Sequence, residues 1–356
     1  MVRNMDRLLP ERPDIYLDEE SSVEKIIICQ PTTSYSVLQS CSITVSIPTF
    51  NGACRITKVL DHLKLQTGVE SLNWAVVVVD NNSNDDTVEV LKDYGSQNSL
   101  PYHLVCIPES QQGAAFARQR AIQAAYTDWV CFLDDDILPE SHWLSSAMEF
   151  IKKVGNVAVF GGQIHGKFEA VPPKDFHRIQ SFLAIRERGN AAHKYDPARL
   201  ILPPSASWVV RRKAWLSAVP SRPTLGGRAR GSMIQGDDYE PLIHLHRAGW
   251  EIWYCPDMHV NHHIPSWRLE EEYLVNLSRG CGLCVCSLRM MGVSAVQGPM
   301  VFARVTLGSL KRLIHHWLKH RRKIDSDLVL LCENAFFLGS FFSSFYFLRI
   351  MLRPKI

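Results

Sequence analysis

Three consecutive aspartates, Asp134, Asp135 and Asp136, follow the apolar run at residues 129–133. Adjacent carboxylates repel one another and are unfavourable inside both helices and strands. Two carboxylates separated by one residue can face one pocket, where a divalent cation relieves their repulsion. Such a cation can also neutralise a diphosphate leaving group. The alternative is a helix N-cap at Asp136, but a cap accounts for only one of the three aspartates.

Two further segments carry groups that could bind a nucleotide. Asp80 ends the run "VVVVD" and is followed by Asn and Ser side chains, which can hydrogen-bond a nucleobase edge and a ribose. The alternative is an ordinary polar turn. Arg118 lies near the start of a helical pattern that follows Gly113. A cation at this position suits an anionic diphosphate better than it suits the helix dipole. The alternative is that Arg118 lies on a solvent-exposed face of the helix.

The last two candidate groups lie further along the chain. Asp237 and Asp238 follow a Gly-rich loop, where a carboxylate could act as a general base; a helix cap is the alternative. His262 and His263 lie beyond an expected strand and could bind a metal or a phosphate, whereas an isolated histidine would more often be structural.

The elements that position these groups are strands alternating with helices. Strand patterns are expected at 42–48, 74–80, 102–108 and 128–134, and helical patterns at 55–66, 85–95 and 113–126, with Gly95 as a stop signal. This alternation predicts an α/β fold with a doubly wound, mostly parallel sheet. Such sheets bind ligands at the carboxyl ends of their strands, where Asn51, Asp80 and Asp134–Asp136 fall.

Composition narrows the class of protein. The chain has 356 residues and a net charge of +3, which is too small to indicate a nucleic-acid partner. Its ten cysteines are scattered singly, as expected for thiols in a reducing compartment. The amino terminus lacks an uninterrupted apolar segment, so we expect no signal peptide and a cytoplasmic protein. We expect an irregular extension at 1–41, a catalytic domain at 42–265 and a helical region at 266–356.

In this order, the motifs resemble family-2 glycosyltransferases of the GT-A fold over Ser42–Pro265. "SIPTFNG" is similar to the opening strand, "VVVVDNNSNDDT" to the base-reading segment, "GAAFARQRAIQAA" to the helix over the nucleotide and "FLDDDILP" to the D-x-D motif. "QGDDYE" and the later "HHIP" resemble the segment with the catalytic base, although Asp237 stands where glutamate is usual. "HHIP" and the helical tail are also similar to hormogonium-polysaccharide glycosyltransferases.

The resemblance implies a role for each matching residue. It implies a nucleoside diphosphate sugar donor, a glycan or lipid-linked acceptor and inversion at the anomeric carbon, in surface polysaccharide biosynthesis. Asp238 would be the base, Asp136 would hold Mn²⁺ or Mg²⁺ with Asp134 and His262, and Asp80 would accept from the nucleobase. The other residues implied to bind the donor are Pro48, Thr49, Asn51, Arg118, Asp134 and Asp135.

The carboxy-terminal region combines a basic and an apolar segment. Residues 301–323 carry seven Lys or Arg and no acid, and residues 328–348 are strongly apolar but are interrupted by Glu333 and Asn334. A membrane span needs about 20 apolar residues, and the interruption favours an interfacial or core-packed helix. A basic helix beside an apolar one fits an anionic membrane surface. We therefore expect peripheral contact with the inner face of the plasma membrane, with packing on the catalytic domain as the alternative.

Two other functions fit part of the pattern. "GDD" together with D-x-D also occurs in nucleotidyltransferases that use two metals for phosphoryl transfer. There the "GDD" sits at the tip of a hairpin, whereas here a helical pattern follows it. A non-catalytic nucleotide-sugar binding protein would be expected to lose the D-x-D or the base, and this chain keeps both.

Overall fold

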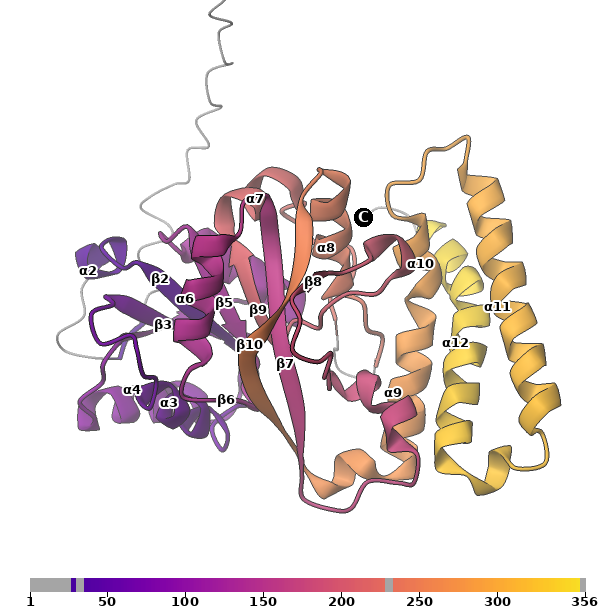
Figure 1. The fold of residues 1–356 in the computed structure, drawn as a ribbon, viewed down its shortest axis with the longest axis horizontal. Coiled ribbons are helices and arrows are strands. Elements are labelled where there is room, and N and C mark those ends of the chain that lie inside the picture. The colour runs from indigo at the N-terminus through magenta and orange to yellow at the C-terminus, as the bar shows by residue number, and fades with distance from the viewer. Residues whose placement is uncertain (1–26, 30–34, 228–232, 353–356) are drawn as a thin grey trace, which may run out of the picture.

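The computed structural model describes residues 27–29, 35–227 and 233–352. A central sheet is covered by helices on both faces, and a block of helices stands at one side (Figure 1). The first half of the sheet is built from β1 (Ile27–Ile28), β2 (Ile43–Thr49), β3 (Trp74–Asp80), β4 (His103–Pro108), β5 (Trp129–Leu133) and β6 (Ile137–Pro139). The second half contributes β7 (Val157–Phe168), β8 (His193–Lys194), β9 (Ser207–Arg211) and β10 (Glu251–Ile264).

The sheet is mixed, and strands β2–β5 in its amino-terminal part are parallel. The strand order is β1-β4-β3-β2-β5-β9-β7-β10-β6, with β8 paired to β10. Strands β4, β3, β2 and β5 are parallel to one another, as are β7 and β10. Strand β9 is antiparallel to both β5 and β7, so it joins the two parallel parts into one sheet. The predicted doubly wound, mostly parallel α/β sheet is confirmed.

Each face of the sheet carries its own core because successive side chains of a strand point to opposite faces. In β3, Val76 and Val78 pack in one core and Val77 and Val79 in the other. The first core is covered by α3 (Ile56–Lys64), α4 (Thr87–Gln97) and α6 (Trp143–Lys153). The second is covered by α5 (Ala114–Ala124), α7 (Arg212–Ala218) and α8 (Tyr239–Arg247).

Two local expectations need correction. Gly95 does not end its helix, since α4 continues to Gln97. A Cβ on Gly95 would lie 2.1 Å from the carbonyl oxygen of Cys29, so this position needs glycine for close approach, not for helix termination. The extension expected to be irregular at 1–41 contains β1 and the short helix α2 (Tyr35–Gln39), while its residues 1–26 lie outside the described ranges.

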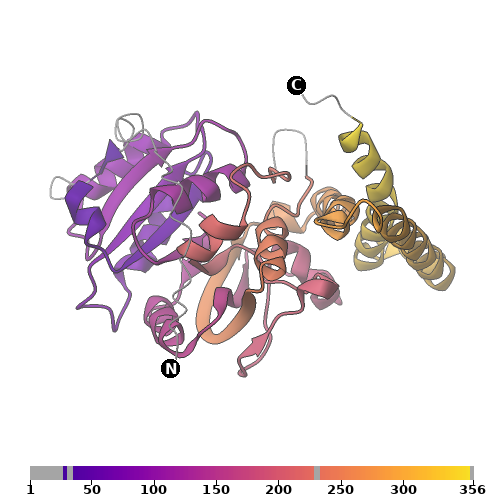
Figure 2. The same cartoon turned by 90° about the horizontal axis from the view of Figure 1, so that it is seen from above.

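The carboxy-terminal region is helical, as expected. It consists of the 3₁₀ turn η4 (Ser266–Leu269), α9 (Glu271–Leu283), α10 (Val285–Met290), α11 (Gly298–His320) and α12 (Leu328–Met351). Figure 2 shows α11 and α12 on the side of α9 that faces away from the sheet. Helix α12 is long and apolar enough to cross a membrane, but 44% of its apolar window is buried within the protein. Its Glu333 pairs with Arg178 and His316, which ties the helix to the rest of the chain.

Helices α9 and α12 approach closely through two glycines. A Cβ on Gly282 would lie 2.4 Å from the Phe336 carbonyl oxygen, and one on Gly339 would lie 2.4 Å from that of Arg279. We therefore expect Gly339→Ala to lower the melting temperature, because overpacking of this kind costs about 1–3 kcal/mol. Thermal unfolding followed by circular dichroism would measure the change.

Gly308→Ala in α11 is the matched control, since a Cβ added there would meet no other atom within 4 Å. There the substitution should stabilise by about 0.8–1.0 kcal/mol through helix propensity alone. Equal melting temperatures for Gly339→Ala and the unmodified protein would contradict the close packing of α9 on α12.

Candidate active site

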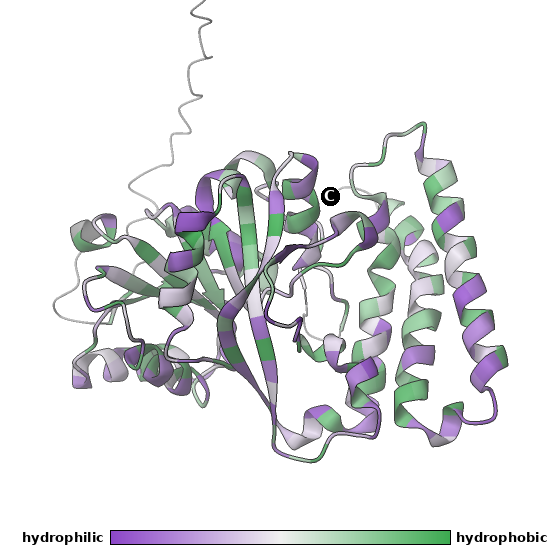
Figure 3. Ribbon diagram, in the orientation of Figure 1, coloured by the Kyte–Doolittle hydropathy of each residue, from purple (hydrophilic) through white to green (hydrophobic). Residues whose placement is uncertain are grey.

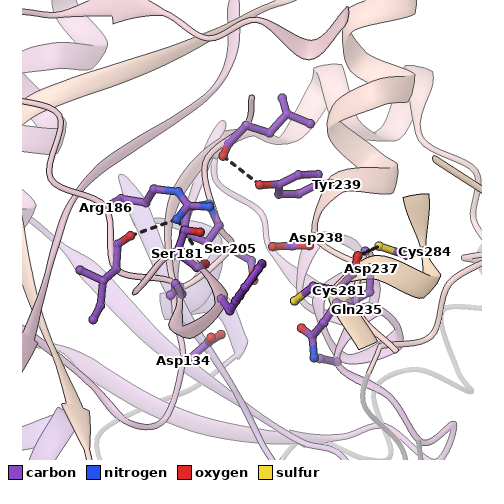
Figure 4. A pocket seen from close by; sticks show the side chains of 18 of the residues that line it. Asp134, Ser181, Arg186, Ser205, Gln235, Asp237, Asp238, Tyr239, Cys281 and Cys284 are labelled. Atoms are coloured by element: carbon purple, nitrogen blue, oxygen red, sulfur yellow. Dashed lines mark hydrogen bonds between the residues drawn. The ribbon is translucent and has the colours of Figure 1, made fainter. Parts of the chain in front are cut away.

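Most of the polar motifs meet in one cavity of about 950 Å³ at the carboxyl ends of the parallel strands, although His262 lies behind Asp136 and is not among the described residues that line it. One half is polar and is lined by Thr49, Arg55, Arg118 and the three aspartates at 134–136. The other half reaches the carboxy-terminal helices, and its lining includes the apolar side chains of Val285, Leu288 and Phe336. Figure 4 shows Asp134 and Asp238 exposed to the same space, with Cys281 and Gln235 at its side.

The three aspartates form a turn between two strands. The Ile137 amide donates to the Asp134 carbonyl at 3.1 Å, and β6 begins immediately afterwards. Strand β6 pairs antiparallel with β10, which places His262 opposite Ile137. The helix N-cap considered for Asp136 is therefore wrong, because the next helix, α6, begins only at Trp143.

Asp135 is held by side chains from β2 and the segment after it. Its Oδ2 accepts from Thr49 Oγ1 at 2.6 Å and from Arg55 Nη2 at 2.8 Å. Burial raises the pKa of Asp135, although the hydrogen bond from Arg55 opposes this shift. Gly52 allows this approach, since a Cβ there would lie 2.1 Å from Thr49 Oγ1. Asp135 therefore shapes the wall of the cavity and fixes the Arg55 guanidinium there.

Asp136 lies beside His262, as predicted, and also beside Arg268, which no sequence motif indicated. Asp136 Oδ2 is 2.8 Å from Arg268 Nη1 and 3.5 Å from His262 Nε2. Burial alone would raise the pKa of Asp136, but the positive charge of the adjacent Arg268 guanidinium holds it well below its usual range. The charged form of this carboxylate is therefore favoured in the folded protein.

The chemistry of these side chains fits a divalent cation. Carboxylate oxygens suit Mn²⁺ and Mg²⁺, and imidazole nitrogen is a common additional ligand. Asp134, two residues from Asp136, keeps 37% of its side chain exposed in the cavity. The Arg268 Nε is buried without a hydrogen-bond partner among the described residues, so this corner also retains an unused donor.

Arg118 connects the D-x-D turn to the second acidic pair. Its guanidinium donates to Asp237 at 2.8 Å and lies 3.5 Å from Asp134, while the side chain is 6% exposed. The solvated helix face considered for Arg118 is therefore wrong. Its Nε is buried and lacks a partner within the described structure, and an oxygen of a bound ligand would satisfy it.

Asp238 stands at the start of α8, next to Asp237. Burial and the neighbouring charge of Asp237 raise the pKa of Asp238 from 3.8 to about 7. Among the described contacts its side chain makes no capping hydrogen bond, so a helix cap does not account for it. A carboxyl with a pKa near neutrality is well matched to general base catalysis. A hairpin tip, the position expected in a nucleotidyltransferase, is also wrong for this pair, since α8 follows directly.

The remaining predicted residues divide into two groups. Pro48 and Thr49 line the cavity. Asn51 and Asp80 are not part of its wall as the described residues form it; Asn51 bonds to Ser83 and Asn84, and Asp80 accepts from the Ser83 amide. Both organise the loops that border the cavity, and contact with a nucleobase stays a prediction for them.

Several arginines in the cavity wall were not predicted. Arg55, Arg186, Arg188 and Arg268 join Arg118 there. Arginine forks match the oxygens of phosphate groups, so this wall suits a diphosphate. Their segments carry no recognisable motif. The sequence offered one indication, which is that the basic residue Arg268 lies three positions after "HHIP".

A second group of possible metal ligands lies outside the cavity wall. Ligand atoms of Glu140, His165 and His259 lie within 4.8 Å of one another. His259 and His262 are three residues apart in β10, so they face opposite sides of the sheet. His165 bonds to Glu187 at 2.7 Å and to His259 at 2.9 Å, with the rings 16° from parallel. These bonds already use the nitrogen atoms that would have to bind a metal.

Comparison with known proteins identifies the family of the catalytic domain. Residues 44–214 match the sequence profile of Glycosyl transferase family 2. The chain therefore carries a family-2 glycosyltransferase domain over these residues. It is similar to glycosyltransferase AglE of Haloferax volcanii, with 32% identity over 123 residues that cover 34% of this chain and 39% of AglE. It is also similar to the glucosyl-dolichyl phosphate glucuronosyltransferase of the same organism, with 24% identity over 202 residues that cover 56% and 62% of the two chains.

A solved structure supports the same fold. The mannosyltransferase PcManGT from Pyrobaculum calidifontis, solved with GDP-Man and Mn²⁺, has a TM-score of 0.53 and 17% identity to this glycosyltransferase. The match covers 92% of this chain and 88% of PcManGT, and it therefore extends into the carboxy-terminal helices. The chain spans 39% and 62% of the lengths of the two curated relatives described above.

Proposed function

We propose that this family-2 glycosyltransferase moves a sugar from a nucleoside diphosphate sugar to a hydroxyl of a glycan or lipid-linked acceptor, with inversion at the anomeric carbon. The observation that carries the proposal is the single cavity shared by Asp134, Asp136 and Asp238, in which Arg118 links Asp134 to Asp237, the neighbour of Asp238. This cavity has arginines that suit a diphosphate and, in the same space, the Asp238 carboxyl, which suits the role of general base. A role in surface polysaccharide biosynthesis stays a prediction from the sequence.

The polar half of the cavity would hold the donor. Its arginines would bind the diphosphate, and Asp136, Asp134 and His262 would hold Mn²⁺ or Mg²⁺. When bound, such a cation would neutralise charge on the leaving diphosphate. PcManGT was solved with a nucleotide sugar and Mn²⁺, which supports a donor of this class.

The apolar half would hold the acceptor. Its walls come from α9, α10, α12 and the segment before β9, and their apolar members are Leu200, Ile201, Leu202, Val285, Leu288 and Phe336. A sugar hydroxyl alone would not need such walls, whereas a lipid chain would gain about 25 cal/mol for each Å² of apolar surface removed from water. The name of one relative, glucosyl-dolichyl phosphate glucuronosyltransferase, includes a lipid phosphate.

Asp238 would take the proton of the acceptor hydroxyl. The acceptor oxygen then forms a bond to the anomeric carbon as the bond from that carbon to the diphosphate breaks, which inverts the configuration. Arg118 would keep Asp237 paired and so place the charge of Asp237 beside Asp238. Positioning of both substrates in one cavity supplies much of the remaining rate enhancement.

A panel of nucleoside diphosphate sugars tests the proposal directly. Each donor is first screened for thermal stabilisation of the protein with and without Mn²⁺, because a ligand of the folded state raises its apparent stability. The donor that stabilises is then incubated with sugar acceptors that carry or lack a long alkyl chain, and the anomeric configuration of the product is determined by NMR. Product of retained configuration, or stabilisation by no donor in the panel, would contradict the proposal.

We further propose that α11 rests on the inner face of the plasma membrane. Its large apolar side chains Leu307, Ile314, Trp317 and Leu318 are 48–65% exposed. Exposed basic residues lie among them, and the hydrophilic positions gather in the second half of α11 (Figure 3). Apolar side chains mixed with Lys and Arg are typical of helices that lie in an anionic membrane surface.

Reversing two charges tests this contact. We expect Lys311→Glu combined with Lys319→Glu to weaken binding to vesicles with anionic lipid by about tenfold or more, since each basic residue near the surface contributes about 1 kcal/mol. Sedimentation with vesicles measures the bound fraction. The double variant Lys153→Glu and Lys213→Glu, on exposed sites of α6 and α7, is the control with the same change in net charge. Equal weakening in both variants would argue against α11 as the contact surface.

A further inference from the structure

A guanidinium occupies the position between the two side chains expected to hold the metal. Arg268 Nη1 lies 2.8 Å from Asp136 Oδ2 and 3.1 Å from His262 Nε2, and those two atoms are 3.5 Å apart. Arg268 belongs to η4, which begins two residues after β10 ends. The same short segment of chain thus supplies one metal ligand and the cation beside it.

The hydrogen bonds of His262 fix the ring in a ligating form. Its Nδ1 lies 2.9 Å from the Leu183 carbonyl oxygen, which can only accept, so Nδ1 carries the proton. In the neutral ring the lone pair is then on Nε2, and it accepts from Arg268. Metal-binding histidines commonly have their second nitrogen held by a carbonyl or carboxylate in this way. His262 and Asp136 are therefore arranged as ligands before any metal arrives.

Because the Asp136 carboxylate is buried, the cation that neutralises it affects the stability of this part of the protein. The side chains of Asp136, His262 and Arg268 are 14%, 7% and 16% exposed. An ionised carboxylate in such a place needs a positive partner, because an unpaired buried charge is strongly destabilising. A guanidinium and a divalent cation cannot share one carboxylate oxygen at close range, since like charges repel more strongly where water is excluded.

We propose that Arg268 is the resident cation of the Asp136–His262 pair and that it competes with the divalent metal for these ligands. The free protein then binds the metal weakly. A nucleoside diphosphate supplies further anionic oxygens for both cations, so metal and nucleotide bind with positive coupling. This inference rests on the proposed metal-assisted transfer and gives Arg268 a regulatory place in it.

Titration of the protein with Mn²⁺ alone tests the competition, with free Mn²⁺ followed by electron paramagnetic resonance. We expect Arg268→Gln to bind Mn²⁺ about tenfold or more tightly than the unmodified protein, because a competing positive charge has been removed. A saturating nucleoside diphosphate should tighten Mn²⁺ binding to the unmodified protein more than to Arg268→Gln. Arg268→Lys keeps the charge and should stay close to the unmodified protein.

Arg188→Gln is the matched control, since Arg188 lines the same cavity but lies over the Tyr195 ring, 5.1 Å from its centre. It removes the same charge and should leave Mn²⁺ affinity nearly unchanged. If Arg268→Gln is less stable, Mn²⁺ should raise its melting temperature more than that of the unmodified protein. Unchanged affinity in Arg268→Gln, an equal gain in Arg188→Gln, or no Mn²⁺ binding to any variant would overturn the proposal. None of these results depends on whether Asp238 catalyses transfer, so failure here is separable from failure of the proposed function.

Discussion

Asp238→Asn is expected to lower the rate of sugar transfer by about 10²–10⁴-fold, the usual contribution of a general base. The amide keeps the size of the side chain but cannot take the proton of the acceptor hydroxyl. Donor binding should persist, because the diphosphate is expected to contact the arginines and the D-x-D turn in the other half of the cavity. Transfer kinetics and donor-induced thermal stabilisation, measured on the same preparation, would show the split between catalysis and binding.

The pKa of Asp238, raised to about 7, gives this prediction a pH dependence. Transfer by the unmodified protein should rise with pH to a plateau above about pH 7, as Asp238 loses its proton. The free energy of unfolding should instead decrease as pH rises. A carboxyl whose pKa is higher in the folded state than its ordinary value of 3.8 stabilises the fold fully only below pH 3.8, and this contribution is lost as pH rises through about 7. Asp238→Asn should therefore gain in melting temperature relative to the unmodified protein between pH 4 and pH 8.

Asp237→Asn is the matched comparison at the neighbouring position. Because the charge of Asp237 raises the pKa of Asp238, its removal should shift the midpoint of the pH–rate profile to lower pH and leave a measurable rate. Turnover that survives in Asp238→Asn would place the base elsewhere. A midpoint that does not move in Asp237→Asn would show that burial alone sets the pKa.

Asp136→Asn is expected to lower transfer by about 10²–10³-fold, because loss of a metal ligand removes several kcal/mol of charge stabilisation. The amide is preferable to alanine, since Asp136 is buried against Arg268 and truncation would leave the guanidinium without its carboxylate partner. The measurement is transfer at increasing Mn²⁺ concentration, together with the melting temperature.

Asp257→Asn on the same β10 strand is a suitable control, since it removes one carboxylate at an exposed site outside the cavity wall. It should leave both the rate and its dependence on Mn²⁺ unchanged. Full activity in Asp136→Asn, with an unaltered requirement for Mn²⁺, would refute the role of Asp136 as a ligand.

The sequence by itself determined the elements and the positions of the acidic motifs. Apolar runs such as 74–80 and the helical spacing of 113–126 are local patterns, and β3 and α5 lie where these patterns placed them. Asp134–Asp136 follow β5 and Asp238 opens α8, so these carboxylates lie at element ends that the sequence marks. Local pattern also indicated that residues 266–356 are helical.

Only the tertiary structure decided which side chains meet. The β6–β10 register brings His262 to Asp136, and Arg118 reaches Asp237 across 119 positions of sequence. Neither contact has a local signal, because each depends on strand pairing and on how α5 and α8 pack over the sheet. The pKa of Asp238 depends on burial and on a charged neighbour, and the presence of Arg268 at the metal ligands depends on the turn after β10. Sequence patterns report the period and the ends of elements, whereas these electrostatic properties arise from distances between residues that are remote along the chain.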